Sequence, residues 1–219
     1  PQLYGQAWGG NEPFSSAVYQ VAWHAGSYTR TEREPLPKNI NLFSFAKGNI
    51  KGDTTQQKIF ITSQAMLQIQ NADGTTAWTG ADGYSGTGVF VDYPDEQFEV
   101  NPKNGALGRY YLPQRIHLQD VDGDGVNEVI LADNVDRTGR VLPRTRMFKE
   151  GRVRCLSWSQ LGLYEEWQTQ PLSGHVSDTA IADLDNDGIK ELIVSVIPPL
   201  SFSLSQPKSY IVMWKITKK

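Results

Sequence analysis

Two short acidic segments carry the clearest chemical signal in this 219-residue sequence. In the first, three aspartates occupy alternate positions and a glutamate follows shortly after. Like charges in so short a run repel one another unless a cation offsets them. Ca²⁺ fits, because it takes about six to eight oxygen ligands and accepts carboxylates and backbone carbonyls in a tight loop. The predicted ligands are the side chains of Asp120, Asp122, Asp124 and Glu128 and the backbone carbonyl of Val126.

The same pattern recurs further along the chain. Its predicted ligands are the side chains of Asp183, Asp185, Asp187 and Glu191 and the backbone carbonyl of Ile189. A third, degenerate copy covers residues 49–53, and the apolar run 58–61 follows it after one extra residue. Lys51 replaces the second carboxylate of that copy, and its ammonium would repel a cation. We therefore expect two calcium ions, with none at the third copy.

Two other interpretations of the acidic segments compete with this one. An EF-hand begins in the same way but needs a glutamate at its twelfth position, where this chain has Leu131 and Val194. An EF-hand loop also lies between helices, whereas the flanks here are predicted strands. The second alternative is a polar turn without a metal, since Asp and Gly favour turns. Two matched copies make that alternative the weaker one.

The segments around the acidic loops have the composition of strands. Short β-branched, apolar runs at 58–62, 128–131 and 191–196 predict buried strands. Alternating polarity at 27–34 and 210–216 predicts half-exposed strands. The sequence Asn-Ala-Asp-Gly at 71–74 predicts a hairpin turn, and the stretch 156–167 fits two strands around a turn better than a helix. The predicted class is all-β.

The chain also repeats with a period of about 65 residues, enough for four short strands. Residues 18–23 match residues 153–158, and the spacing is close to that between the third and second acidic loops. A repeated four-stranded unit predicts β-propeller blades of four antiparallel strands, and a two-sheet sandwich is the alternative. The predicted blade units of this single domain are 1–35 (partial), 36–100, 105–172 and 173–219 (partial). We expect remaining blades of a longer chain, or another subunit, to complete the ring.

The acidic loops resemble those of the FG-GAP or VCBS repeats of integrin-α-like β-propellers, which have the form Asp-x-Asp-x-Asp-Gly-x-x-acidic followed by an apolar strand. The resemblance is specific over residues 118–131 and 181–196 and weaker over 44–62. It implies that calcium staples the loop between the first two strands of a blade, and that partners dock on the opposite face. It also implies a protein that is exported to the periplasm, the cell surface or the medium.

An insertion at residues 80–111 precedes the second complete unit and is rich in aromatic residues. Long loops on a repeat scaffold often carry binding sites. We therefore take four of its rings as candidate partner-binding residues: Tyr84, Phe90, Tyr93 and Phe98. The alternative is that these rings fold back over the propeller as a lid.

Composition narrows the function further. The net charge is −3, with 21 basic and 24 acidic side chains, so the basic excess of a nucleic-acid-binding protein is missing. No apolar run is long enough for a membrane span. The sequence predicts a non-catalytic, calcium-stabilised module that binds a protein or a glycan or serves structural assembly. The alternative is part of a carbohydrate-active enzyme whose catalytic residues lie in other blades. Glu165 and Glu166 of this chain cannot act as a catalytic pair, because adjacent strand residues point to opposite faces.

Overall fold

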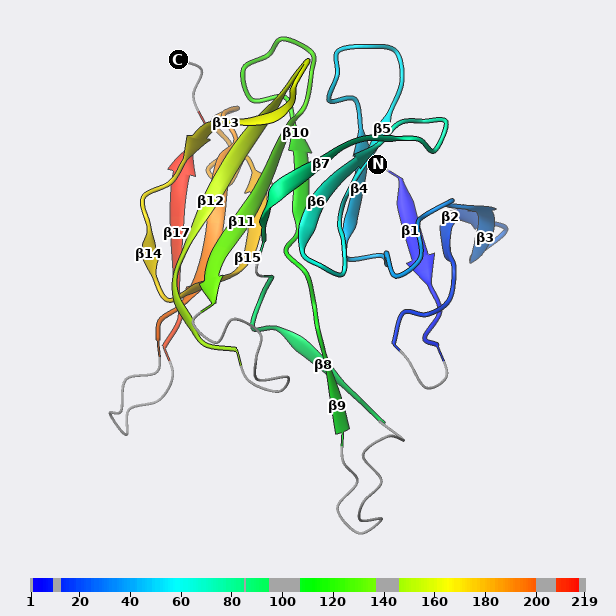
Figure 1. The fold of residues 1–219 in the computed structure, drawn as a ribbon, viewed down its shortest axis with the longest axis horizontal. Helices are drawn as coiled ribbons and strands as arrows, with labels where there is room; N and C mark the ends of the chain where they lie inside the picture. The colour runs from blue at the N-terminus through cyan, green and yellow to red at the C-terminus, as the bar shows by residue number, and fades with distance from the viewer. Residues whose placement is uncertain are drawn as a thin grey trace.

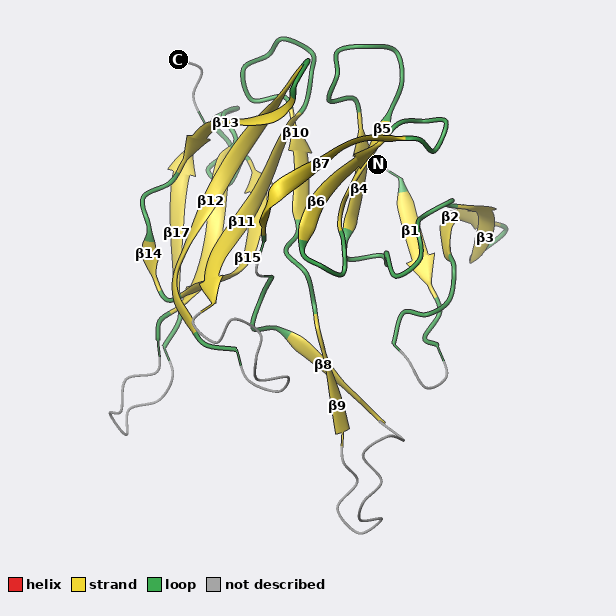
Figure 2. Cartoon of the chain, in the orientation of Figure 1, coloured by secondary structure: helices red, strands yellow, loops and turns green. Residues whose placement is uncertain are grey.

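The computed structural model describes residues 2–9, 13–84, 86–94, 107–136, 146–199 and 208–216. Within these ranges the chain forms strands, turns and loops but no helix (Figure 2). The strands pair in antiparallel sheets, so the predicted all-β class is confirmed. No helix of the described ranges is therefore long and apolar enough to cross a membrane.

Four sheets and one separate hairpin contain the described strands, and in each sheet the strands follow the order of the chain. Sheet 1 consists of β1 (Leu3–Gln6), β2 (Val18–His24) and β3 (Ser27–Arg33). Sheet 2 consists of β4 (Phe45–Gly48), β5 (Gln57–Ile61), β6 (Met66–Gln70) and β7 (Thr76–Gly83). The hairpin consists of β8 (Phe90–Pro94) and β9 (Leu107–Tyr111). Sheet 3 consists of β10 (Ile116–Gln119), β11 (Glu128–Asp136), β12 (Phe148–Ser159) and β13 (Gly162–Gln168), and the short β14 (Leu172–Ser173) pairs with β12. Sheet 4 consists of β15 (His175–Ala182), β16 (Glu191–Ile197) and β17 (Tyr210–Lys215).

Two predicted turns form at glycines whose backbone conformation suits them. The turn at 71–74 joins β6 to β7, and Gly74 has a φ of 88°, which glycine adopts at little cost. A second turn joins β12 to β13 at Gly162, whose φ is 116°. A Cβ atom on Gly162 would lie 2.1 Å from the indole nitrogen of Trp78 in sheet 2. Glycine at this turn therefore allows sheet 3 to approach sheet 2 closely.

The register of the third, degenerate loop differs from the predicted one. Gly48 pairs with Gln57 across β4 and β5, just as Gln119 pairs with Glu128 in sheet 3 and Ala182 with Glu191 in sheet 4. The predicted extra residue is therefore wrong, and the loop has the same length as the two acidic ones. Gln57 stands where the acidic loops have a glutamate, and this replacement hides the match from a pattern based on acidic residues.

The hydrophobic core consists of two clusters, one on each face of sheet 3. Between sheets 2 and 3 the buried residues include Ile59, Leu67, Ile69, Val129, Leu131 and Leu156. Between sheets 3 and 4 they are Ile130, Ala132, Val153, Cys155, Val176, Leu192, Val194 and Val196. Alternate residues of a strand face opposite sides, so β11 is buried on both faces. This explains why residues 129–132 form a continuous apolar run rather than an alternating one.

The sheets lie side by side in chain order, from sheet 1 to sheet 4 (Figure 1). Strand β4 lies against β10, and β11 and β12 lie against β15. The β4–β5 and β10–β11 loops are at one edge of the body, and the β8–β9 hairpin projects from the opposite edge (Figure 1). The described sheets form an open series without closing into a barrel or ring.

Candidate metal centres

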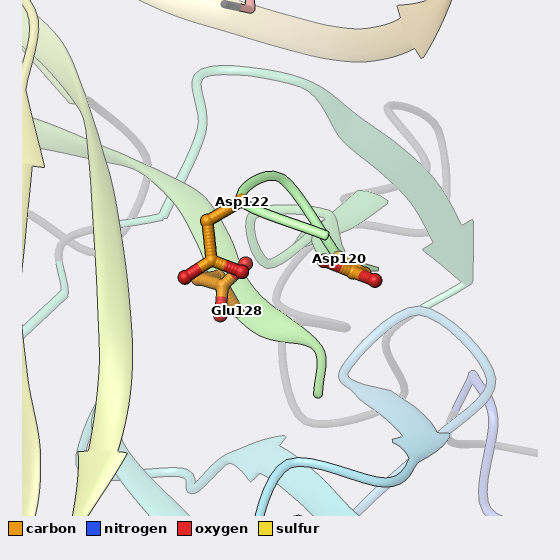
Figure 3. A group of neighbouring side chains, drawn as sticks. All are labelled: Asp120, Asp122 and Glu128. Carbon is orange, nitrogen blue, oxygen red and sulfur yellow. The ribbon is translucent and has the colours of Figure 1, made fainter. Parts of the chain in front are cut away.

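The first acidic loop gathers three carboxylates at the turn between β10 and β11 (Figure 3). Asp120 directly follows β10, Glu128 begins β11, and Asp122 lies between them. One carboxylate oxygen from each residue lies within 4.8 Å of the others. Calcium binds oxygen at about 2.4 Å, so oxygens on opposite sides of one ion are about 5 Å apart. The three carboxylates are spaced closely enough to share a calcium ion.

Hydrogen bonds inside this loop hold the carboxylates in place. Asp120 accepts the amide of Gly123 at 2.5 Å through Oδ1 and the amide of Gly125 at 3.0 Å through Oδ2. Both glycines have positive φ, at 76° and 87°. At the other end of the loop, the amide of Val121 donates to Glu128 Oε2 at 2.9 Å. Hydrogen bonds of the chain itself therefore shape the loop.

The fourth predicted carboxylate of this loop, Asp124, is not part of the cluster of three, and the predicted carbonyl ligand Val126 is on the same turn. Asp124 uses Oδ1 to accept the amide of Val126 at 2.7 Å. The structure thus brings three of the four predicted carboxylates together, and the fourth lies on the same turn.

The electrostatics of Glu128 also point to a cation. The side chain is buried, and burial raises its pKa to about 7. The hydrogen bond from Val121 lowers the pKa, whereas the charges of Asp122 and Asp124 raise it further. A carboxylate in this position is costly to ionise near neutral pH, and a divalent ion beside it would offset that cost.

The second acidic loop repeats this geometry between β15 and β16. Asp183, Asp185 and Glu191 also bring one carboxylate oxygen each within 4.8 Å of the others. Asp183 Oδ2 accepts the amide of Gly188 at 3.0 Å, and Glu191 Oε2 accepts the amide of Leu184 at 2.8 Å. The same bonds as in the first loop therefore shape the second.

Glu191 provides the strongest indication that a ligand belongs in this loop. Its side chain is fully buried, and its Oε1 has no hydrogen-bond partner among the described residues. A buried polar atom without a partner is unfavourable and calls for an explanation. A metal ion held by Glu191, Asp183 and Asp185 would provide one.

Among the described residues, a lysine of β17 contacts carboxylates of the second loop, and no such ion pair occurs at the first loop. Lys215 Nζ lies 3.1 Å from Asp185 Oδ2 and also contacts Asp187 Oδ2. The hydrogen bonds to these carboxylates raise the pKa of Lys215, and the bond from Lys215 lowers the pKa of Asp187. The sequence pattern does not indicate this lysine, because only the pairing of β17 with β16 places Lys215 opposite Glu191. The predicted carbonyl ligand Ile189 is on this loop, where its amide donates to Asp187 Oδ1 at 2.8 Å.

The third loop is shaped by neutral amides at the same positions. Asn49 Oδ1 accepts the amide of Gly52 at 2.9 Å, and Gln57 Oε1 accepts the amide of Ile50 at 3.1 Å. Lys51 Nζ donates to Asn71 Oδ1 at 2.7 Å and lies 4.7 Å from the centre of the Trp158 ring in sheet 3. This lysine therefore makes a cation–π contact between two sheets.

The acidic loops also contact neighbouring sheets, and the sequence pattern does not predict these contacts. In the first loop, Asn127 donates from its backbone and side-chain nitrogens to the carbonyl of Asn49, each at 2.9 Å. The corresponding residue of the second loop, Lys190, donates to Gln119 Oε1 at 2.7 Å. Each loop thus contacts the sheet that precedes it.

The four aromatic candidates of the insertion lie in different environments. Tyr84 is buried, and burial raises its pKa to about 12. Phe90 is exposed on β8. Tyr93 lies across the hairpin from Gly108, where a Cβ atom would come within 2.6 Å of the tyrosine ring. Phe98 lies outside the described residues. The described part of the hairpin projects from the body rather than folding back over it (Figure 1).

A cavity of about 830 Å³ opens at the base of this hairpin, against parts of sheets 1 and 2. Its volume is within the range of ligand pockets. Its lining combines cationic and aromatic side chains, including Arg33, Lys38, Arg109, Arg146, Tyr110 and Tyr111. The guanidinium of Arg146 lies 4.3 Å from the centre of the Tyr111 ring.

Glu165 and Glu166 form hydrogen bonds within the fold, and Cys155 lies in the core. Glu165 accepts a hydrogen bond from Arg154 Nε at 2.7 Å, and Glu166 accepts one from Ser157 Oγ at 2.5 Å. Cys155 is fully buried, and burial raises the pKa of its thiol.

A search against protein-family models and a search of curated proteins found no match for this chain.

Proposed function

We propose that this chain is a non-catalytic, calcium-stabilised β-propeller module of an exported protein. One observation carries the proposal: equivalent carboxylate clusters lie at the same turn of two neighbouring sheets, and one of them contains the buried, unpartnered oxygen of Glu191. Calcium supplies the positive charge that both clusters require.

The sheet arrangement supports a propeller. Sheets 2 and 3 each contain four consecutive antiparallel strands, and sheets 1 and 4 each contain three. Sheet 3 packs face to face on sheet 2 and on sheet 4 through apolar residues, as blades do. Equivalent strand pairs carry the three loops, and the loops of sheets 2 and 3 lie at one edge of the body (Figure 1).

The metal loops act on packing between blades as well as on single hairpins. Asp120 and Glu128 fix the turn that carries Asn127, and Asn127 donates to the carbonyl of Asn49 in the preceding loop. Ordering the turn therefore orders a contact between two sheets. Calcium sites of extracellular modules often have dissociation constants of about 10⁻⁴ to 10⁻³ M, which suits an exported protein.

The edge opposite these loops is the proposed binding region. The β8–β9 hairpin projects from this edge (Figure 1). It carries the exposed Phe90, and the cavity lies at its base. Aromatic rings offer contact area, and arginine guanidinium groups recognise carboxylates. We assign the partner to proteins or glycans that present acidic groups to this cavity.

Calcium titration tests the metal part of the proposal. After EGTA treatment and dialysis, calorimetry should show two calcium ions per chain and a rise in melting temperature. Asp122→Asn and Asp185→Asn should each remove one ion, whereas the matched change Asp53→Asn in the third loop should remove none. Absence of calcium binding at millimolar concentration would refute the metal assignment.

A glycan array and a panel of acidic peptides test the binding part. We expect binding that weakens in Arg109→Ala and Arg146→Ala, two variants of the cavity. Turnover assays on every bound glycan should show no hydrolysis. Hydrolysis of a bound glycan would replace the non-catalytic assignment with the carbohydrate-active alternative.

A further inference from the structure

Sheet 3 shows how two neighbouring sheets bury each other's apolar residues. We call the face that points to the following sheet the leading face, and the face that points to the preceding sheet the trailing face. The leading face of sheet 3 carries four residues that sheet 4 buries completely: Ile130, Ala132, Val153 and Cys155. Ile130 pairs with Cys155, and Ala132 pairs with Val153.

Three of the four corresponding residues on the leading face of sheet 4 are also apolar, the fourth is Ser195, and no sheet of the described residues covers that face. Ile193 pairs with Met213, and Ser195 pairs with Ile211, in the register of the four buried residues of sheet 3. Ile211 is 72 % exposed and Met213 is 45 % exposed. The two β17 positions, whose counterparts in sheet 3 are fully buried, are therefore exposed to solvent in sheet 4.

The loops repeat this contrast. Each of the three equivalent loops has an apolar residue directly after its first Asn or Asp. Ile50 of the first loop in the chain is buried in the cluster shared with sheet 3, and Val121 of the second packs on the cluster shared with sheet 4. The third such residue, Leu184, is 56 % exposed. The leading edge of sheet 4 thus extends the exposed apolar surface.

Sheet 1 shows the complementary situation on its trailing face. In sheet 3, Trp158 lies on the trailing face and packs on the cluster shared with sheet 2. Trp23 holds the corresponding place in sheet 1, because each tryptophan makes the second pair from its turn, Trp23 with Tyr28 and Trp158 with Leu163. Trp23 is 63 % exposed, and its neighbours on the exposed side are Tyr28, in ring contact at 4.9 Å, and the exposed Leu3.

We propose that the leading face of sheet 4 binds the trailing face of sheet 1 of a second copy of this chain. The proposal rests on the propeller arrangement proposed above, and it continues the contact by which sheet 2 packs on sheet 3 and sheet 3 on sheet 4. Aliphatic Ile211 and Met213 would cover the aromatic surface around Trp23, and both faces would leave water. Two copies joined head to tail place eight sheets in series, within the usual range of four to eight blades.

A closed dimer of this kind makes the contact twice, once in each direction. A single substitution on either face therefore damages both contacts. The chain should be dimeric by light scattering at micromolar concentration. Ile211→Asp and Trp23→Asp should each weaken dimerisation by about 100-fold or more, because each places a charge in an apolar contact. Leu161→Asp is the matched control, since Leu161 is an apolar residue that is 94 % exposed at the β12–β13 turn.

Mixing the two variants identifies which faces meet. Ile211→Asp retains an intact trailing face and Trp23→Asp an intact leading face, so an equimolar mixture should form heterodimers through one undamaged contact. Circular dichroism and calcium stoichiometry should match those of the unmodified protein in both variants. A monomeric chain at 100 µM, taken as about a hundredfold excess over a micromolar dissociation constant, would overturn the inference. So would a dimer insensitive to Ile211→Asp, or variants that fail to complement. A dimer that binds no calcium would refute the metal assignment and leave the dimer contact standing.

Discussion

Replacing Glu128 by glutamine should stabilise the fold without calcium and lose that advantage when calcium is bound. Without the ion, the buried carboxyl has a pKa of about 7, above its ordinary value of 4.5. A group whose folded pKa is raised favours folding while it is protonated, so this contribution is fully present below about pH 4.5 and is lost as pH rises through 7. At about 1.4 kcal/mol per pKa unit, ionising Glu128 costs the ion-free fold about 3 kcal/mol at pH 8.

The Glu128→Gln variant removes this cost and keeps the loop. The amide oxygen of glutamine can accept the Val121 amide, as Gln57 accepts that of Ile50 in the third loop. In EGTA at pH 8 the variant should be more stable than the unmodified protein by about 3 kcal/mol, or about 6–12 °C in melting temperature for a chain of this size. In calcium this advantage should largely disappear, because a site occupied at a hundredfold excess over Kd contributes about 2.7 kcal/mol to the unmodified protein alone.

Thermal melts followed by circular dichroism at pH 5 and pH 8, in EGTA and in 10 mM calcium chloride, measure both effects. Glu32→Gln, on the exposed strand β3, is the matched control and should change neither condition. If Glu128→Gln is no more stable than the unmodified protein in EGTA at pH 8, then the cost assigned to the buried carboxylate is wrong. If the variant keeps its full calcium response, Glu128 is not a ligand.

Three further predictions concern other parts of the chain. Lys215→Met should raise the calcium affinity of the second loop in calorimetry, because it removes the ammonium that contacts Asp185 and Asp187; equal affinity would show that the lysine does not compete. Asn134→Ala should lower the free energy of unfolding by about 2–4 kcal/mol in urea melts, because the buried amide donates to the carbonyls of Gly86 and Val176 and accepts the amide of Val176, and its loss removes all three buried hydrogen bonds. A loss below 1 kcal/mol, about the value of a single net hydrogen bond, would contradict this. Cys155 should resist a thiol reagent such as DTNB in the folded protein and react on unfolding, because it is fully buried with a raised thiol pKa; rapid reaction of the native protein would contradict the burial.

The acidic loops were predictable because their geometry is local. Aspartates two residues apart with a following glycine specify both the turn and the carboxylate cluster, so three of four predicted acidic ligands come together in the first loop. Lys215 was not predictable, because it reaches Asp185 only through the pairing of β16 with β17. Gln57 was not predictable from a pattern of acidic residues, because an amide can shape the same turn as a carboxylate.

The strands show the same division between local and distant information. The turns at 71–74 and at Gly162 follow from their own residues, and the apolar run 129–132 indicates a strand covered on both faces. The packing of one sheet on another depends on contacts between residues far apart in sequence. The bond of Asn127 to Asn49 is one example, since neither asparagine has a sequence context that predicts the other.

The amide-held turn at 49–57 gives the molecule an uneven response to chelation. Asn49 and Gln57 keep that turn folded with neutral groups, so sheet 2 has no carboxylate cluster there to destabilise it. Removing calcium should instead destabilise sheets 3 and 4 first, while sheet 2 stays folded. Hydrogen exchange in EGTA should then accelerate first in β15–β16 and β10–β11, while β4–β5 stays protected.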